Sequence, residues 1–147
     1  MNELQAAAES LKLRLVTVEA ATEVELEPAF AKASGYPVQG MITSTDPVFF
    51  GVRDRIIALA TKYKIPAIHD FREYPAAGGL MSYGTNILAL YRQVGVYTGQ
   101  ILRGAQPSEL PVLQPTVFDL VINLKTAKTL GLTMPPSLLA RADEVIE

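Results

Sequence analysis

Three groups of polar and aromatic residues in this 147-residue sequence lie at the ends of predicted strands or inside a glycine-bracketed extended segment. They are Ser44, Thr45 and Asp46; His69, Asp70 and Phe71; and Ser82 with Tyr83. Carboxylates and hydroxyls can bind the polar groups of a small molecule, and aromatic rings can stack on its apolar part. In a sheet of parallel strands, ligands bind beyond the carboxyl ends of the strands. These residues are therefore the candidates, and all of them except Asp70 are predicted solute contacts.

Each of these groups also has a structural interpretation. Asp46 precedes a proline and is typical of a helix N-cap, although a capping carboxylate can still bind a ligand through its second oxygen. The hydroxyls of Ser44 and Thr45 can satisfy the backbone of a turn. The rings of Phe71 and Tyr83 can pack in the core. The sequence leaves both roles open.

Catalysis and metal binding are disfavoured. His69 is the only histidine, cysteine is absent, and no nucleophile elbow is present. We therefore expect His69 to have a structural role, with contact to a solute in the cleft as the second possibility. Asp70 and Glu73 are interpreted as solvated loop charges rather than an acid and base pair. The glycines at 78, 79 and 84 lack the GxGxxG spacing of a dinucleotide site. We expect no cofactor and no enzyme activity.

The composition limits the partners. The formal net charge is -2 and the lysines and arginines are scattered, which argues against nucleic acid and anionic membranes as partners. A small molecule fits this surface better. No apolar run approaches the roughly 20 residues of a membrane-spanning helix, and the first five residues, MNELQ, lack the pattern of an export signal.

Helical and strand-like hydrophobic patterns alternate along the chain, which predicts an α/β fold with a parallel sheet and right-handed crossovers. The expected helices cover 2–11, 22–34, 47–64, 86–103, 125–130 and 136–146. The expected strands cover 13–18, 38–43, 65–69, 78–84 and 117–122.

The second half of the chain carries a series of recognisable segments. They are GGLMSYG at 78–84, ILRGAQP at 101–107, LPV at 110–112, QPT at 114–116, VINLKTA at 121–127, and LGLTMPPSLLARADEVI at 130–146. In this order and spacing the chain resembles the ABC transporter substrate-binding family, which includes tryptophan- and tyrosine-type receptors of the type I periplasmic binding architecture.

The resemblance implies an extracytoplasmic, periplasmic receptor of an ABC importer that captures a small solute, such as an aromatic amino acid, between two lobes and docks on a membrane permease. It implies that 13–84 form a three-layer carboxyl-terminal lobe and that 85–116 belong to the other lobe. Residues 117–147 then form the segment that returns from the other lobe. The amino-terminal lobe is then largely missing. The surface that this lobe would otherwise cover is exposed, which favours a homodimer.

The resemblance also implies that Asp46 faces the cleft between the lobes, where its carboxylate can pair with an ammonium group. Two alternatives stay open. The first is a self-associating structural protein without a working cleft. The second is an α/β enzyme that uses Asp46, His69 and Asp70.

Overall fold

Five strands form one sheet in the computed structural model, which describes residues 2–147. The strands lie side by side in chain order: β1 Met41–Ile42, β2 Ala67–His69, β3 Met81–Thr85, β4 Phe118–Asn123 and β5 Glu144–Ile146. Three neighbouring pairs are parallel, and the pair of β3 and β4 is antiparallel. The predicted α/β class is confirmed, and the sheet is mostly parallel.

Eight α-helices connect these strands or lie beside them in the described part of the chain. They are α1 Asn2–Ser10, α2 Glu23–Ser34, α3 Pro47–Gly51, α4 Arg53–Lys62, α5 Glu73–Ala76, α6 Ile87–Leu102, α7 Leu124–Thr129 and α8 Pro136–Leu139. A single 3₁₀ turn, Pro107–Glu109, lies in the segment that follows α6.

The main core forms where α2 and α4 pack on each other and on β2. Leu26 and Phe30 of α2 and Ile56 and Leu59 of α4 are buried, and their spacing of three or four residues sets each pair on one side of its helix. At the rim of this contact, Glu27 of α2 pairs with two basic side chains of α4. The core therefore holds both helices against the sheet.

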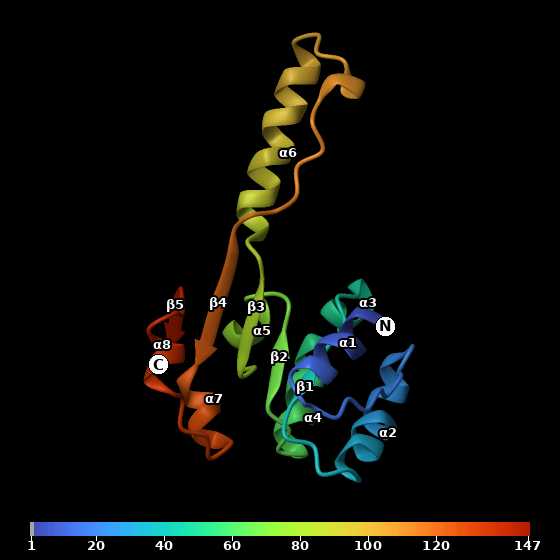
Figure 1. Cartoon of the computed structure of the whole chain (residues 1–147), viewed down its shortest axis with the longest axis vertical. Helices are drawn as coiled ribbons and strands as arrows, with labels where there is room; N and C mark the ends of the chain where they lie inside the picture. Colours follow the sequence, from blue (N-terminus) through green and yellow to red (C-terminus); the bar gives the residue numbers. More distant parts are fainter. Residues whose placement is uncertain (1) are drawn as a thin grey trace.

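Helix α6 projects from the sheet as a long arm (Figure 1). Asn86 caps its first turn by accepting a hydrogen bond from the Ala89 N–H at 2.8 Å. The chain returns along the helix through 103–117, where the Tyr97 hydroxyl donates to the Pro111 carbonyl at 2.6 Å. The predicted helix at 86–103 is confirmed.

Two predicted strands differ from the structure. Residues 13–18 form no strand and pair with none of the described strands. The buried strand expected at 38–43 is reduced to β1, which is the outermost strand of the sheet and has an exposed Ile42.

Three further predictions are wrong in part. The helix expected at 47–64 is divided at Val52, which ends α3 and begins α4. The helix expected at 136–146 stops at Leu139, and Glu144–Ile146 pair with β4 instead. The wholly parallel sheet is also incorrect, because the chain returns from the arm in the opposite direction and β4 runs antiparallel to β3.

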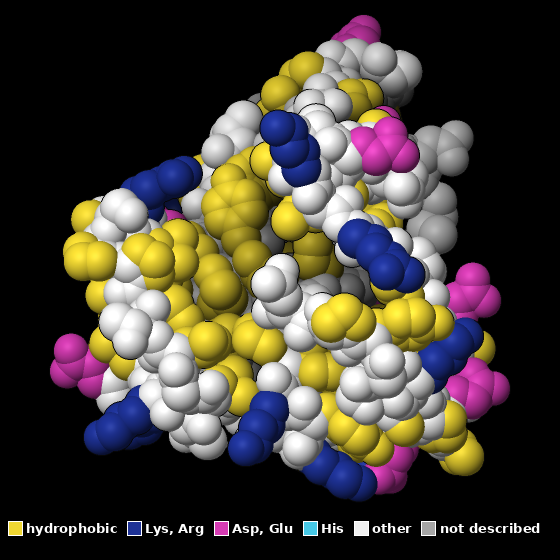
Figure 2. Space-filling model, turned by 60° about the horizontal axis from the view of Figure 1, so that its bottom comes forward, with side chains coloured by type: hydrophobic (Ala, Val, Ile, Leu, Met, Phe, Trp, Pro, Cys, Tyr) yellow, Lys and Arg dark blue, Asp and Glu magenta, His cyan; other side chains and the backbone are white. Residues whose placement is uncertain are grey.

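The face of the molecule opposite the arm is hydrophobic at its centre (Figure 2). Apolar side chains surround a hollow there, and lysine and arginine side chains are spaced singly around them. This face has no continuous basic surface. None of the described helices is long and apolar enough to cross a membrane.

Candidate functional site

The carboxyl ends of β1, β2 and β3 and the amino end of β4 lie along one edge of the sheet, from which the arm rises (Figure 1). All of the predicted contact residues lie at this edge. Ser44, Thr45, Asp46 and Tyr83 are exposed, Asp70 and Phe71 are half-buried, and His69 and Ser82 are buried.

Asp46 begins α3 as a capping residue. Its Oδ1 accepts a hydrogen bond from the Val48 N–H at 2.7 Å, and Pro47 occupies the first helical position. No other described group bonds its carboxylate, so the second oxygen is free to bind a solute. The structure therefore establishes the cap, and the ligand role stays a prediction.

His69 lies beneath the edge and joins three elements. Its Nδ1 lies 2.9 Å from the Thr43 Oγ1 at the end of β1, and its ring stacks on Tyr74 of α5 with centroids 4.0 Å apart. Burial lowers the pKa of His69 to about 4, so the imidazole is neutral at neutral pH. Neutral His69 therefore fixes the position of β1 and Tyr74 from below.

Asp70 follows β2 directly and lies against the end of β3. A Cβ added at Gly84 would stand 1.8 Å from the Asp70 carbonyl oxygen, so only glycine allows this approach. The Asp70 Oδ2 is buried and has no hydrogen-bond partner among the described residues. The interpretation of Asp70 as a solvated loop charge is therefore corrected: a carboxylate oxygen without a partner is held at the edge.

Three aromatic rings from the neighbouring segments contact one another. Phe50 of α3 meets Phe71 edge-on at 5.3 Å between centroids and Tyr74 at 6.4 Å. Burial and then the charge of Asp70 raise the pKa of Tyr74 to about 12, and the charge of Arg53 opposes this shift. The charges of Asp70 and Arg53 therefore act in opposite directions on the pKa of Tyr74.

Arg53 is a basic group at this edge. Its guanidinium lies over the Phe50 ring, 5.4 Å from the centroid. Its Nε is buried without a hydrogen-bond partner among the described residues, although the Asp54 Oδ1 is 3.6 Å away. The Arg53 side chain is half-buried.

Tyr83 and Ser82 point to opposite faces of β3. Ser82 is buried beside His69 in the register of β2 and β3, whereas Tyr83 is exposed and stacks on Phe118 of β4 with centroids 5.9 Å apart. Tyr83 therefore lies on the sheet face away from His69.

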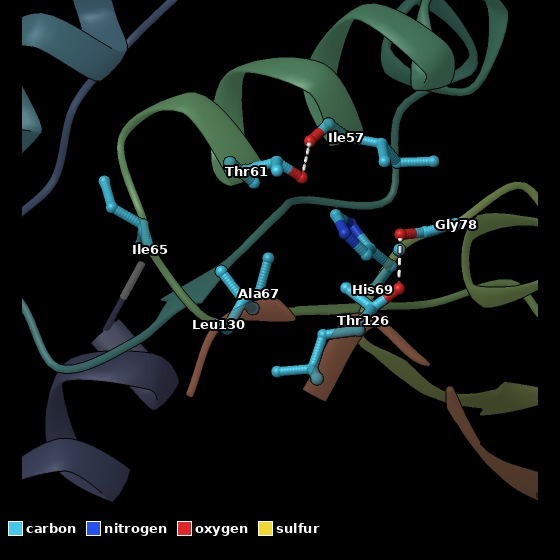
Figure 3. Close-up of a pocket in the computed structure, with 11 residues that line it drawn as sticks. Ile57, Thr61, Ile65, Ala67, His69, Gly78, Thr126 and Leu130 are labelled. Atoms are coloured by element: carbon cyan, nitrogen blue, oxygen red, sulfur yellow. Dashed lines mark hydrogen bonds between the residues drawn. The ribbon is translucent and has the colours of Figure 1, made fainter. Parts of the chain in front are cut away.

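A small, partly open cavity lies between α4, β2 and α7, and His69 lines it (Figure 3). Hydrogen bonds from Thr126 to the Gly78 carbonyl and from Thr61 to the Ile57 carbonyl lie at its wall. Its volume of about 10 Å³ is close to the space of one water molecule. This cavity is too small for an organic solute.

A second hollow is open to solvent beside α2. It is lined by Thr17, Val18, Glu19, Glu25, Pro28, Ala29 and Lys32. Its Glu25 carboxylate already accepts from the Ala21 N–H at 2.7 Å. Within residues 2–147, no group of three histidine, aspartate or glutamate side chains is placed to hold a metal ion. The edge of the sheet is therefore the candidate site.

The edge combines an unpartnered carboxylate oxygen, an unpartnered guanidinium N–H and a cluster of aromatic rings. Unpartnered buried polar atoms are costly, and a ligand that bonds them removes this cost. Such a set can bind a molecule with a cationic group, an anionic group and an aromatic ring. The sequence alone does not identify Thr43, Phe50, Arg53 and Tyr74 as site residues, because only the fold of α3 to α5 brings them to the strand ends.

A family model for ABC transporter substrate binding proteins matches residues 1–146. The chain belongs to this substrate-binding family. The family is one of binding proteins rather than enzymes, and the resemblance seen in the sequence is confirmed.

Solved structures of substrate-binding proteins share the fold. A conserved domain protein from Vibrio cholerae O1 biovar El Tor superposes with a TM-score of 0.86 at 28% identity, covering 99% of this chain and 49% of the other. The ABC domain from Streptococcus pneumoniae in complex with L-Trp gives a TM-score of 0.89 at 26% identity, covering 99% and 49%. No curated protein matches the chain.

A ligand-free, open substrate binding protein with adhesive properties from Clostridium difficile gives a TM-score of 0.69 at 23% identity, with 99% of this chain and 48% of the other covered. This likeness concerns the fold alone. The chain therefore spans about half the length of the solved family members it matches.

Proposed function

We propose that the chain is the solute-binding part of an ABC importer and that it holds an aromatic amino acid, or a closely related zwitterion, at the carboxyl edge of its sheet. The observation that carries this proposal is the pair of opposite charges, Asp70 and Arg53, each with a buried atom that has no hydrogen-bond partner among the described residues. An α-amino acid presents both complementary charges.

The ammonium group would bond the Asp70 carboxylate, with the free oxygen of Asp46 as a second acceptor. The carboxylate would bond the Arg53 guanidinium. The aromatic side chain would lie against Phe50 and Phe71. The L-Trp in the pneumococcal neighbour supports this class of solute.

The remaining parts of the proposal follow the family. The protein would act outside the cytoplasm, where the loaded lobe docks on a membrane permease and releases the solute for import. Binding by closure of two lobes would let a second lobe cover the solute and exclude water. The half of the architecture described here would then supply one wall of the site.

The experiment is a melting-temperature titration with three related compounds. L-Trp carries both charges, tryptamine lacks the carboxylate, and indole-3-propionate lacks the ammonium group. We expect a rise in melting temperature that grows with the logarithm of concentration for L-Trp and is weaker for both analogues.

Matched variants test the two charges. Asp70→Asn and Arg53→Gln each remove one charge at the edge, and Asp54→Asn removes an exposed carboxylate next to Arg53 in the sequence. We expect the L-Trp shift to fall in the first two variants and to persist in the third. Equal shifts in all three variants, or stronger binding of an analogue than of L-Trp, would contradict the proposal.

A further inference from the structure

Three buried side-chain atoms in the described part of the chain have no hydrogen-bond partner: the Arg53 Nε, the Asp70 Oδ2 and the His69 Nε2. The first two belong to the proposed solute site. The His69 Nε2 is not used by that site, and the whole residue is only 3% exposed. A buried imidazole nitrogen without a partner costs free energy, so a partner for it has to be sought close to the ring.

The other contacts of the His69 ring are already made. Its Nδ1 lies 2.9 Å from the Thr43 Oγ1, and Tyr74 stacks on the ring with centroids 4.0 Å apart and planes 7° from parallel. Burial lowers the pKa of His69 to about 4, so at neutral pH the Nε2 either carries a single proton or offers a lone pair. The partner of the Nε2 therefore has to be able to accept or to donate a hydrogen bond.

The small cavity between α4, β2 and α7 is lined by His69 (Figure 3). Its volume of about 10 Å³ corresponds to one water molecule. None of its 11 lining residues is a lysine, arginine, aspartate or glutamate, so the cavity offers no opposite charge to a cation or an anion. Size and charge both select a single water molecule, which can accept and donate.

Two threonines that line the cavity supply further partners for a water. The Thr126 Oγ1 donates to the Gly78 carbonyl and the Thr61 Oγ1 donates to the Ile57 carbonyl, both at 2.9 Å (Figure 3). A hydroxyl that donates its one proton still has lone pairs that accept. A water in the cavity can therefore donate to a threonine oxygen while it bonds His69, which meets the need of a buried water for at least two polar partners.

We propose that this cavity binds one structural water molecule and that this water is the hydrogen-bond partner of the His69 Nε2. The water joins β2 to α4 or α7 through a threonine hydroxyl, and His69 joins β2 to the end of β1 through Thr43. Because Asp70 follows His69 directly, the water stiffens the floor beneath the proposed solute site. The water site itself does not depend on that proposed function, since it rests on the cavity and the unpartnered nitrogen.

Magnetic cross-relaxation between water and methyl protons of the isotope-labelled chain tests the water site without any solute. The methyl groups of Ala60 and Ala67 line the cavity and hold no exchangeable proton, whereas Ala127 is equally buried but does not line it. We expect the signal of a long-lived water at Ala60 and Ala67 and no such signal at Ala127. A wild type without the signal at Ala60 and Ala67 has a dry cavity, and a signal of equal size at Ala127 reports water throughout the core; either result would overturn the proposal.

Two variants assign the water to the Nε2. His69→Phe keeps an aromatic ring and both threonine hydroxyls but removes the nitrogen, so the signal at Ala60 and Ala67 should disappear. Thr43→Val removes only the partner of the Nδ1 and should retain the signal. Persistence of the signal in His69→Phe, which is the behaviour of protons relayed from the threonine hydroxyls, would overturn the assignment, as would its loss in both variants.

Amide spectra show whether each variant keeps the fold. The imidazole nitrogen signals of the wild type provide a test that needs no variant. We expect both ring nitrogens to have the chemical shifts of hydrogen-bonded atoms. An Nε2 with the shift of an unbonded nitrogen would overturn the proposal even if neither variant folded.

Discussion

At the scale of single residues, burial decides the role of His69. The ring is held between Thr43 and Tyr74, and its pKa is lowered from 6.5 to about 4 because the charged form is poorly solvated there. A histidine after a parallel strand is a natural candidate for ligand binding. Here it supports the edge from beneath, and the neighbouring Asp70 carries the unpartnered oxygen.

This lowered pKa predicts a loss of stability in acid. The unfolded chain takes up a proton at His69 near pH 6.5, and the folded chain does so only near pH 4. The His69 contribution is therefore complete above about pH 6.5 and falls as the pH drops toward 4, by about 3 kcal/mol in all.

Urea unfolding of the wild type and of His69→Gln at pH 7.5 and 4.5 measures this contribution. The variant cannot titrate at position 69, and its amide can still bond Thr43. We expect the stability advantage of the wild type at neutral pH to shrink by most of that amount in acid. An advantage independent of pH would show that His69 keeps its ordinary pKa in the fold.

Gly84 provides a second prediction at this scale. Gly84→Ala places a methyl group 1.8 Å from the Asp70 carbonyl oxygen and 2.7 Å from its carbon, and both are backbone atoms that cannot rotate away. We expect a loss of at least about 2 kcal/mol in urea unfolding. Gly51→Ala is the control, since its Cβ meets nothing within 4 Å. Equal stability of the two variants would contradict the close approach of β3 to Asp70.

At the scale of elements, the structure separates two possible roles of Asp46. Asp46→Ala removes the cap of α3 and should cost about 1 kcal/mol of stability, whereas Asp46→Asn keeps an oxygen for the Val48 N–H and should cost little. If Asp46 also binds an ammonium group, Asp46→Asn should weaken L-Trp binding about tenfold or more at unchanged stability. Unchanged affinity in Asp46→Asn would restrict the residue to its capping role.

Local patterns predicted the helices better than the strands. The helices expected at 22–34 and 86–103 rest on local patterns, and both are found. Strand formation depends on a neighbour, so 13–18 stay unpaired although their sequence suits a strand. Residues 144–146 have a helical pattern but pair with β4, because tertiary pairing outweighs propensity in so short a segment.

At the scale of the whole molecule, the family could be predicted from the order of the segments at 78–84, 101–107, 121–127 and 130–146. The direction of β4 could not be predicted from the sequence. A chain that leaves the sheet along α6 and returns can re-enter it parallel or antiparallel to β3. The strand-end rule located the edge and most of its residues. It missed Arg53 and Phe50, which come from α4 and α3 and approach the edge only through tertiary packing.

The central claim is that the carboxyl edge of the sheet binds an amino-acid solute. Nuclear magnetic resonance tests this claim most directly, because it detects even the weak binding expected if one wall of a two-lobed site acts alone. Isotope-labelled chain would be titrated with L-Trp while the backbone amide signals are followed. The account predicts concentration-dependent shifts at 43–46, 50–53, 70–71 and 84–85. Shifts confined to the hollow at 17–32, or none at millimolar L-Trp, would contradict it.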